Sequence, residues 1–134
     1  MKNSSFEGGF SAGWNNNFDR IVSVDAHTGK YLCDAERTSN GTQWQQQTVD
    51  VSGAGYYTLS AHVKSVTSGT IKLKIQALDE SNTVIGTETV SITETDGWQR
   101  FTVILDTSSP VKKIRVYFGF EGSQGHYYID DVQL

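Results

Sequence analysis

Residues Thr70–Leu78 read TIKLKIQAL, a stretch in which apolar and polar side chains alternate from Ile71 to Ala77. Because successive side chains of a β-strand point to opposite faces, this pattern predicts a strand with one apolar and one polar face. The apolar set is Ile71, Leu73, Ile75 and Ala77, and the polar set is Lys72, Lys74 and Gln76. Such a strand is typical of a sheet that covers a core on one side and meets solvent on the other.

Alternation of the same kind recurs on both sides of this stretch. In Tyr56–Lys64 it would turn Tyr57, Leu59, Ala61 and Val63 inward and leave Thr58, Ser60 and His62 outside. In Val111–Phe120 it would turn Ile114, Val116, Phe118 and Phe120 inward and leave Arg115, Tyr117 and Gly119 outside. Three strands with one apolar and one polar face are typical of the sheets of a sandwich.

The rest of the chain divides into short runs of this type, and no window keeps a helical period. Turn-forming residues, such as those at 52–55 and 96–97, separate the runs. We predict strands at Phe18–Asp25, Lys30–Arg37, Trp44–Val51, Tyr56–Lys64, Thr70–Leu78, Val84–Ile92, Gln99–Leu105, Val111–Phe120 and His126–Leu134. The sequence therefore predicts an all-β, antiparallel sandwich or barrel of eight or nine strands.

Length and composition limit the possible partners. The 134 residues suffice for a core without disulfides, and we expect residues 1–134 to form a single domain. The net charge of -4 argues against nucleic acid, because binding to the phosphate backbone depends on clustered Lys and Arg. No apolar run approaches the roughly 18 residues of a membrane helix, so no membrane partner is expected. The lone cysteine, Cys33, is predicted to be a buried core residue.

The first residues contain no apolar segment of the kind found in signal peptides. Either the protein is not exported by this route, or the sequence is a piece of a larger exported chain. We favour the second interpretation, because the sequence begins almost directly on what reads as domain structure. It predicts an extracellular module.

The closing stretch Gly125–Leu134 reads GHYYIDDVQL and predicts a last strand with two adjacent carboxylates, Asp130 and Asp131. Because neighbours in a strand point to opposite faces, one of the two must lie toward protein and needs a partner. Another acid, Glu7, lies between aromatics and glycines near the start of the chain. If the first and last segments lie side by side, Glu7 and Asp130 could share a cation.

The polar halves of the alternating strands suggest a binding surface. If the chain winds as a jelly roll, the second, fourth, fifth and eighth predicted strands fall in one sheet. Their polar residues would then lie together: His62, Lys74, Gln76, Arg115 and Tyr117. The alternative is that these are ordinary solvated residues of an exposed sheet.

Four pieces of the sequence carry a resemblance to a known group of proteins. They are Asn3–Glu7 with Gly13-Trp14, Gln46–Val49 leading to Gly55–Ser60, Gly97–Thr102, and Tyr127–Val132. In this order they resemble the β-sandwich carbohydrate-binding modules of families four, nine, sixteen and twenty-two. The resemblance implies a non-catalytic jelly-roll module that is usually linked to a catalytic domain in a secreted polysaccharide-degrading enzyme. The expected ligand is a plant-cell-wall polysaccharide such as β-glucan, mannan or xylan.

The resemblance also implies a structural calcium ion (Ca2+). Its ligands would be Glu7, Asp130 and main-chain carbonyls from the turn at Gly29-Lys30. Calcium takes six to eight oxygen ligands, which agrees with two carboxylates helped by carbonyls and water. The alternative is that both acids are solvated or capped by backbone N–H groups.

Exposed aromatic side chains are the expected platforms for sugar rings, whose apolar CH faces stack on them. Trp14 lies in a Gly-Trp-Asn-Asn-Asn loop and is predicted to be exposed. By resemblance to the family-sixteen modules, the second platform would be an aromatic just before the closing Asp-Asp pair, Tyr127 or Tyr128. Gln76 fits one glutamine position of those modules.

Two further tryptophans differ in their expected roles. Trp44 lies among glutamines and could stack on a sugar or cover the end of the sandwich, whereas Trp98 opens a strand and is expected to pack. The predicted ligand-binding residues are Trp14, Trp44, His62, Gln76, Arg115, Tyr117 and Tyr127. His62 and His126 are predicted to be hydrogen-bonded or solvated rather than metal ligands, because no second histidine stands at ligand spacing.

Enzyme classes find little support in the sequence. It shows no nucleophile elbow, phosphate loop, Cys-His pair or zinc pattern. The paired carboxylates that a glycosidase needs occur by chance in any acidic domain. The alternative to a carbohydrate-binding module is an adhesion or assembly domain of a phage tail or cell-surface protein, where jelly-roll modules of this kind also occur.

Overall fold

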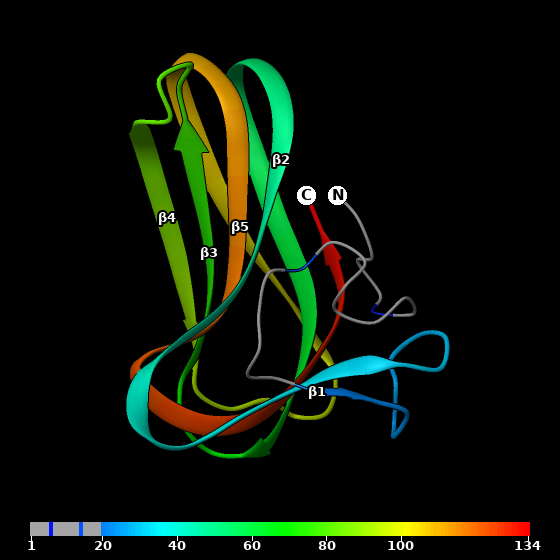
Figure 1. Cartoon of the computed structure of the whole chain (residues 1–134). Helices are drawn as coiled ribbons and strands as arrows, with labels where there is room; N and C mark the ends of the chain where they lie inside the picture. The colour runs from blue at the N-terminus through cyan, green and yellow to red at the C-terminus, as the bar shows by residue number, and fades with distance from the viewer. Residues whose placement is uncertain (1–5, 7–13, 15–19) are drawn as a thin grey trace.

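The computed structural model describes Phe6, Trp14 and residues 20–134. Regular structure in these residues is entirely β, in the strands β1 (Arg20–Val22), β2 (Leu32–Thr67), β3 (Ile71–Leu78), β4 (Val84–Ile92) and β5 (Gln99–Gln133). The strands pair antiparallel in the order β1-β2-β5-β3-β4 (Figure 1). The predicted all-β, antiparallel class is therefore confirmed. The described part of the chain contains no apolar helix of membrane-spanning length.

The predicted count of eight or nine strands is not confirmed, because β2 runs for 36 residues and β5 for 35. Each of these strands changes partner along its length through register shifts. Within the predicted turn at 52–55, Gly53 pairs with Val111 and Gly55 pairs with Thr107, so the ladder continues where strand ends were expected. Gly53 and Gly55 have φ angles of 103° and 132°, which residues with a side chain rarely adopt. These glycines bend the strand without ending it.

The paired segments form two layers (Figure 1). One layer consists of β4, β3, residues 111–120 of β5 and residues 43–50 of β2. The other consists of residues 99–107 of β5, 55–67 of β2, 126–133 of β5, 33–37 of β2, and β1. The expected grouping of the second, fourth, fifth and eighth predicted strands is therefore wrong. Alternation shows which side chains face the core, but it does not show which strands pair.

The core between the layers contains the side chains that alternation turned inward. Almost fully buried are Leu59, Ala61, Val63, Ile71, Leu73, Ile75, Ala77, Ile114, Val116, Phe118 and Phe120, and Tyr57 packs against them half-buried. Cys33 is buried as predicted. Phe6 and Trp14 also belong to this core, where both rings contact Phe118.

Candidate functional site

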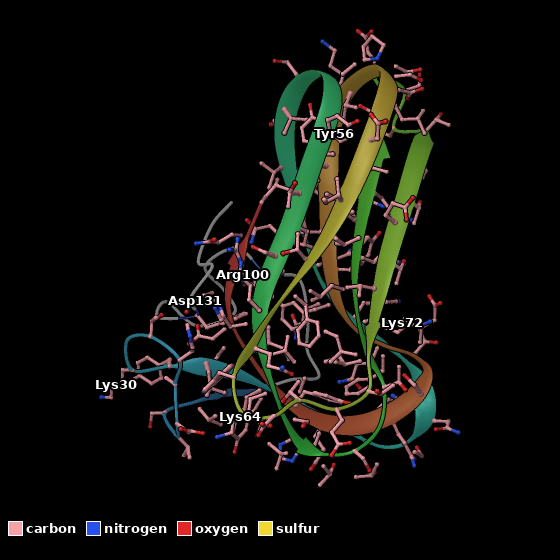
Figure 2. All side chains as sticks on the ribbon, turned by 180° about the vertical axis from the view of Figure 1, so that it is seen from behind. Lys30, Tyr56, Lys64, Lys72, Arg100 and Asp131 are labelled. Atoms are coloured by element: carbon pink, nitrogen blue, oxygen red, sulfur yellow. The ribbon has the colours of Figure 1, made fainter. Side chains whose placement is uncertain are left out.

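The outer side of the β3-β4 layer carries polar and aromatic side chains from four strand segments. Residues opposite one another in paired strands lie on the same face, so the register arranges these side chains in three rows. The rows are Trp44, Gly119, Lys72 and Ser91; Gln46, Tyr117, Lys74 and Thr89; and Thr48, Arg115, Gln76 and Thr87. We call these twelve residues the polar face. Lys72 marks its position in Figure 2, on the side of the view away from Lys30 and Asp131.

The β2 segment of the polar face has its polarity inverted. Gln43, Gln45 and Gln47 are only 8%, 0% and 7% exposed, whereas Trp44 between them faces outward and contacts Tyr117. A half-buried strand normally buries its tryptophan and exposes its glutamines. Such a departure from the usual pattern is expected where a surface has a function, because it places an aromatic ring outside the core.

Tyr117 is the centre of the polar face. Its ring meets that of Trp44 edge-on, with centroids 5.6 Å apart. The Lys74 Nζ atom lies 4.3 Å from the centroid of each ring. The Tyr117 hydroxyl donates to Gln76 Oε1 at 2.8 Å and accepts from Arg115 Nη1 at 3.3 Å. Two aromatic rings, two cations and an amide are thus held in a fixed arrangement.

The polar face is positively charged although the protein as a whole is acidic. Lys72, Lys74 and Arg115 belong to it, and none of its twelve residues carries a carboxylate. At its edge, Lys72 Nζ lies 3.5 Å from Glu121 Oε1, a distance at the long end for an ion pair. Burial lowers the pKa of Lys74 from its ordinary value. The ammonium of Lys74 is therefore partly deprived of water.

These groups have the chemistry of a sugar-binding surface. Trp44, which is partly exposed, provides a ring that can contact the CH groups of a sugar, and Tyr117, only 8% exposed, packs against this ring. Gln46, Gln76 and Arg115 provide donors and acceptors around them for hydroxyl groups.

A second polar cluster lies at the closing end of β5. The carboxylate of Asp130 is fully buried, and its Oδ2 atom accepts from the backbone N–H groups of His27 and Thr28, both at 3.1 Å. Its Oδ1 atom accepts from the backbone N–H of Asp131 at 2.8 Å. Burial raises the pKa of Asp130 to about 6, against the opposing effect of these hydrogen bonds. The inward carboxylate of the Asp-Asp pair thus has backbone donors as partners.

His27, His62 and Asp131 complete this cluster. The two imidazole rings stack with centroids 3.9 Å apart, and His27 Nδ1 lies 2.6 Å from Asp131 Oδ2. One potential ligand atom from each of the three residues lies within 4.8 Å of the others. Burial, and then the neighbouring His27, lower the pKa of His62. The sequence did not predict this approach, because His27 lies in a turn distant from His62 along the chain.

Comparison with known families identifies the type of domain. A family model described as a carbohydrate binding domain matches residues 1–124. The chain belongs to this family of carbohydrate-binding domains. The predicted resemblance is therefore confirmed. No curated protein sequence matches the chain.

Solved structures of carbohydrate-binding domains share the fold. A family-61 module in complex with β-1,4-galactotriose has a TM-score of 0.74 at 20% identity, and the match covers 98% of this chain and 94% of that one. The xylan-binding domain of Xyn10C from Paenibacillus barcinonensis has a TM-score of 0.69 at 15% identity, with 99% and 90% covered. Tailspike protein 4 of bacteriophage CBA120 has a TM-score of 0.76 at 15% identity, but the match spans 98% of this chain and only 20% of the tailspike.

Four of the residues predicted to bind ligand lie together on the polar face of this carbohydrate-binding domain: Trp44, Gln76, Arg115 and Tyr117. His62 does not join them, because its segment of β2 pairs with Arg100 and Asp130 in the other layer. Lys74, which was predicted to share the surface, contacts both aromatic rings. The pairing register places Lys74 opposite Tyr117 and His62 opposite residues of the other layer.

The two predicted platforms are not exposed. Trp14 is 6% exposed and stacks on Phe6 at 5.7 Å between ring centroids. Tyr127 is fully buried, and its hydroxyl lies 2.8 Å from the Thr93 carbonyl oxygen and 2.9 Å from that of Gly69. The prediction of exposure is therefore wrong for both rings. A polar loop sequence did not indicate that Phe6 and Phe118 would cover Trp14.

Asp130 and Lys30, two of the residues predicted to hold calcium, belong to the described part of the chain. Asp130 lies against the 27–30 turn, as the prediction required, but the N–H groups of that turn point at it. The side chain of Lys30 is exposed, with Nζ 5.3 Å from the Tyr31 ring centroid. Glu7 lies outside the described residues. The acceptor oxygens of Asp130 suit a calcium ion, and a cation beside this buried carboxylate would offset the loss of its hydration.

Proposed function

We propose that this domain binds a polysaccharide without catalysis, through the polar face. Trp44 forms the aromatic platform, Tyr117 packs against it, and Gln46, Gln76 and Arg115 bind hydroxyl groups. The observation that carries the proposal is the outward tryptophan between buried glutamines, joined to Tyr117. Trp44 is partly exposed, whereas Tyr117 is only 8% exposed and packs against it, so the ring that Trp44 turns outward is the one available to a ligand.

Related structures support a sugar as the ligand. One was solved with β-1,4-galactotriose and another is a xylan-binding domain. The polar face also lacks what hydrolysis of a glycosidic bond would need, namely two carboxylates that flank the bond about 5 to 9.5 Å apart. Binding rather than cleavage is the function that its residues support.

The expected context is a larger extracellular chain with a catalytic domain. A structure of a carbohydrate-binding module joined to a xylanase catalytic module, with xylohexaose bound, offers a precedent for such a chain. The tailspike similarity favours the second candidate, an adhesion or assembly domain of a phage tail or cell-surface protein. We also propose that the strands wind as a jelly roll. A structural calcium ion would be held by Glu7, Asp130 and the Lys30 carbonyl.

Calorimetry of the Trp44→Ala variant against soluble galactan, xylan, mannan and β-glucan tests the proposal. The loss of one aromatic platform should weaken binding about tenfold, equivalent to roughly 1.4 kcal/mol. Tyr56→Ala is the matched control, because Tyr56 is 75% exposed and belongs to the other layer, where it pairs with Asp106. Figure 2 shows it at the far tip of the molecule from Lys64.

Equal affinities of the parent and Trp44→Ala would show that the polar face is not the binding site. If the parent binds no glycan, neutral or acidic, the adhesion or assembly function becomes the better explanation.

A further inference from the structure

We propose that the natural ligand is an acidic polysaccharide, in which sugar carboxylates bind Lys74 and Arg115. This inference rests on the proposed function and specifies the chemical class of its ligand. It follows from the charge, the contacts and the spacing of side chains on the polar face.

The charge of the polar face is opposite to that of the protein. The chain has a formal net charge of -4, yet the twelve residues of the polar face include three cations and no carboxylate. A surface that binds only hydroxyl groups needs donors and acceptors of either kind. A concentration of one sign of charge raises the local concentration of ligands of the opposite sign.

The ammonium of Lys74 is placed for an anion. Its Nζ atom lies 4.3 Å from the centroids of both Trp44 and Tyr117, and within the described residues it forms no ion pair. Burial lowers its pKa, and the charge of Glu121 opposes this shift without forming an ion pair with the ammonium. A carboxylate bound here would supply a direct partner, while the Trp44 ring contacts the sugar that carries it.

Arg115 provides the second charge. One nitrogen, Nη1, donates to the Tyr117 hydroxyl, which leaves other guanidinium N–H groups for a ligand. Guanidinium groups bind carboxylates through paired hydrogen bonds. Arg115 lies two strand positions from Tyr117, the residue opposite Lys74, so the backbone positions of the two cationic residues are offset by about 7 Å along the strands. A chain with carboxylates on successive sugars could reach both.

The alternative is that Lys74 and Arg115 bind the hydroxyl groups of a neutral glycan. The two possibilities differ in one measurable respect. A neutral site should bind a uronic acid oligomer and its methyl ester equally, whereas an acidic-glycan site should prefer the free acid, because esterification removes only the charge.

The experiment is calorimetry with oligomers of galacturonate, mannuronate and glucuronate, each as free acid and as methyl ester. We expect at least one free acid to bind tenfold or more tightly than its ester. That preference should shrink as salt is raised, because salt screens charge pairs at a surface. Neutral galactan, xylan, mannan and β-glucan are measured in parallel.

Variants assign the preference to the named cations. Lys74→Gln and Arg115→Gln should each reduce the preference for the free acid about tenfold, and Lys74→Arg should retain it. Lys64→Gln removes the same charge from the other layer, where Lys64 pairs with Tyr128, and should leave the preference for the free acid unchanged (Figure 2). A thermal melt of each variant confirms that it is folded.

Two results would overturn the inference. If neutral glycans or methyl esters bind as tightly as every free acid, the inference is wrong and the proposed function still holds. A preference for the acid that survives in both Gln variants would place the charge recognition elsewhere. Failure to bind any neutral or acidic glycan would instead overturn the proposed function itself.

Discussion

Replacing Tyr127 by Phe should destabilise the domain without affecting glycan binding. Tyr127 is fully buried, and its hydroxyl lies within 3.2 Å of three backbone carbonyl oxygens, those of Gly69, Ile92 and Thr93. The hydroxyl has one hydrogen and can fully satisfy only one of them at a time. Because Phe has nearly the same shape, no cavity forms, and the cost is that of carbonyls left without this donor. We expect about 1 to 3 kcal/mol of lost stability.

Urea and thermal denaturation measure this loss. For a domain of this size it should lower Tm by roughly 4 to 11 °C. Tyr56→Phe is the control, because the exposed Tyr56 should show a change within about 0.5 kcal/mol. Unchanged stability of Tyr127→Phe, or a loss of glycan affinity at unchanged stability, would refute the structural role that we assign to Tyr127.

Three further predictions concern the same core and the closing end of β5. Burial, aided by the charge of Glu94, raises the pKa of Tyr127 in the folded protein. The unfolded chain loses this proton near a pKa of about 10, so the free energy of unfolding should fall as the pH rises above that value. The urea midpoint should fall less steeply with pH in Tyr127→Phe than in the parent. A chelator should lower Tm if calcium is bound at Asp130, since a ligand at a hundredfold excess over its Kd contributes about 2.7 kcal/mol; an unchanged melt with no metal by elemental analysis would contradict the calcium proposal. Trp14→Ala should lose about 3 to 5 kcal/mol in denaturation experiments but keep the affinity for glycans, because Trp14 packs on Phe118 inside the core.

The fold class and the core could be predicted because both depend on local alternation. Ile71, Leu73 and Ile75 are buried where the period of two placed them. The ends of strands could not be predicted in the same way. Gly53 and Gly55 read as a turn that ends a strand, but their pairing with the opposite bend of β5 keeps the ladder continuous. The pairing of Gly53 and Gly55 with β5 joins residues far apart in the sequence, and a single sequence does not predict such pairs.

The candidate site could be predicted in part, because its residues come from three segments that only the register brings together. The polar face of β3 was identified from Lys74 and Gln76, and Arg115 and Tyr117 were placed beside it. His62 was assigned to the same surface through a wrong choice of neighbouring strands. For Trp44 the sequence left two roles open, a sugar platform or a cover for the end of the sandwich, and the burial of its neighbours Gln43 and Gln45 in the structure puts the tryptophan outside.

The net charge of the chain does not predict the chemical class of the ligand, because it does not report the charge of one surface. A total of -4 argues against a phosphate backbone as a partner, but it averages over two layers with different surfaces. Lys74 and Arg115 belong to different strands, and antiparallel pairing places them around one tyrosine. A local field of this kind acts on a ligand within about 10 Å at moderate salt, so acidic residues beyond that range do little to cancel it, and Glu121 at the edge of the face lies beside Lys72. We therefore expect the polar face to select an anionic sugar chain on a protein that is itself an anion.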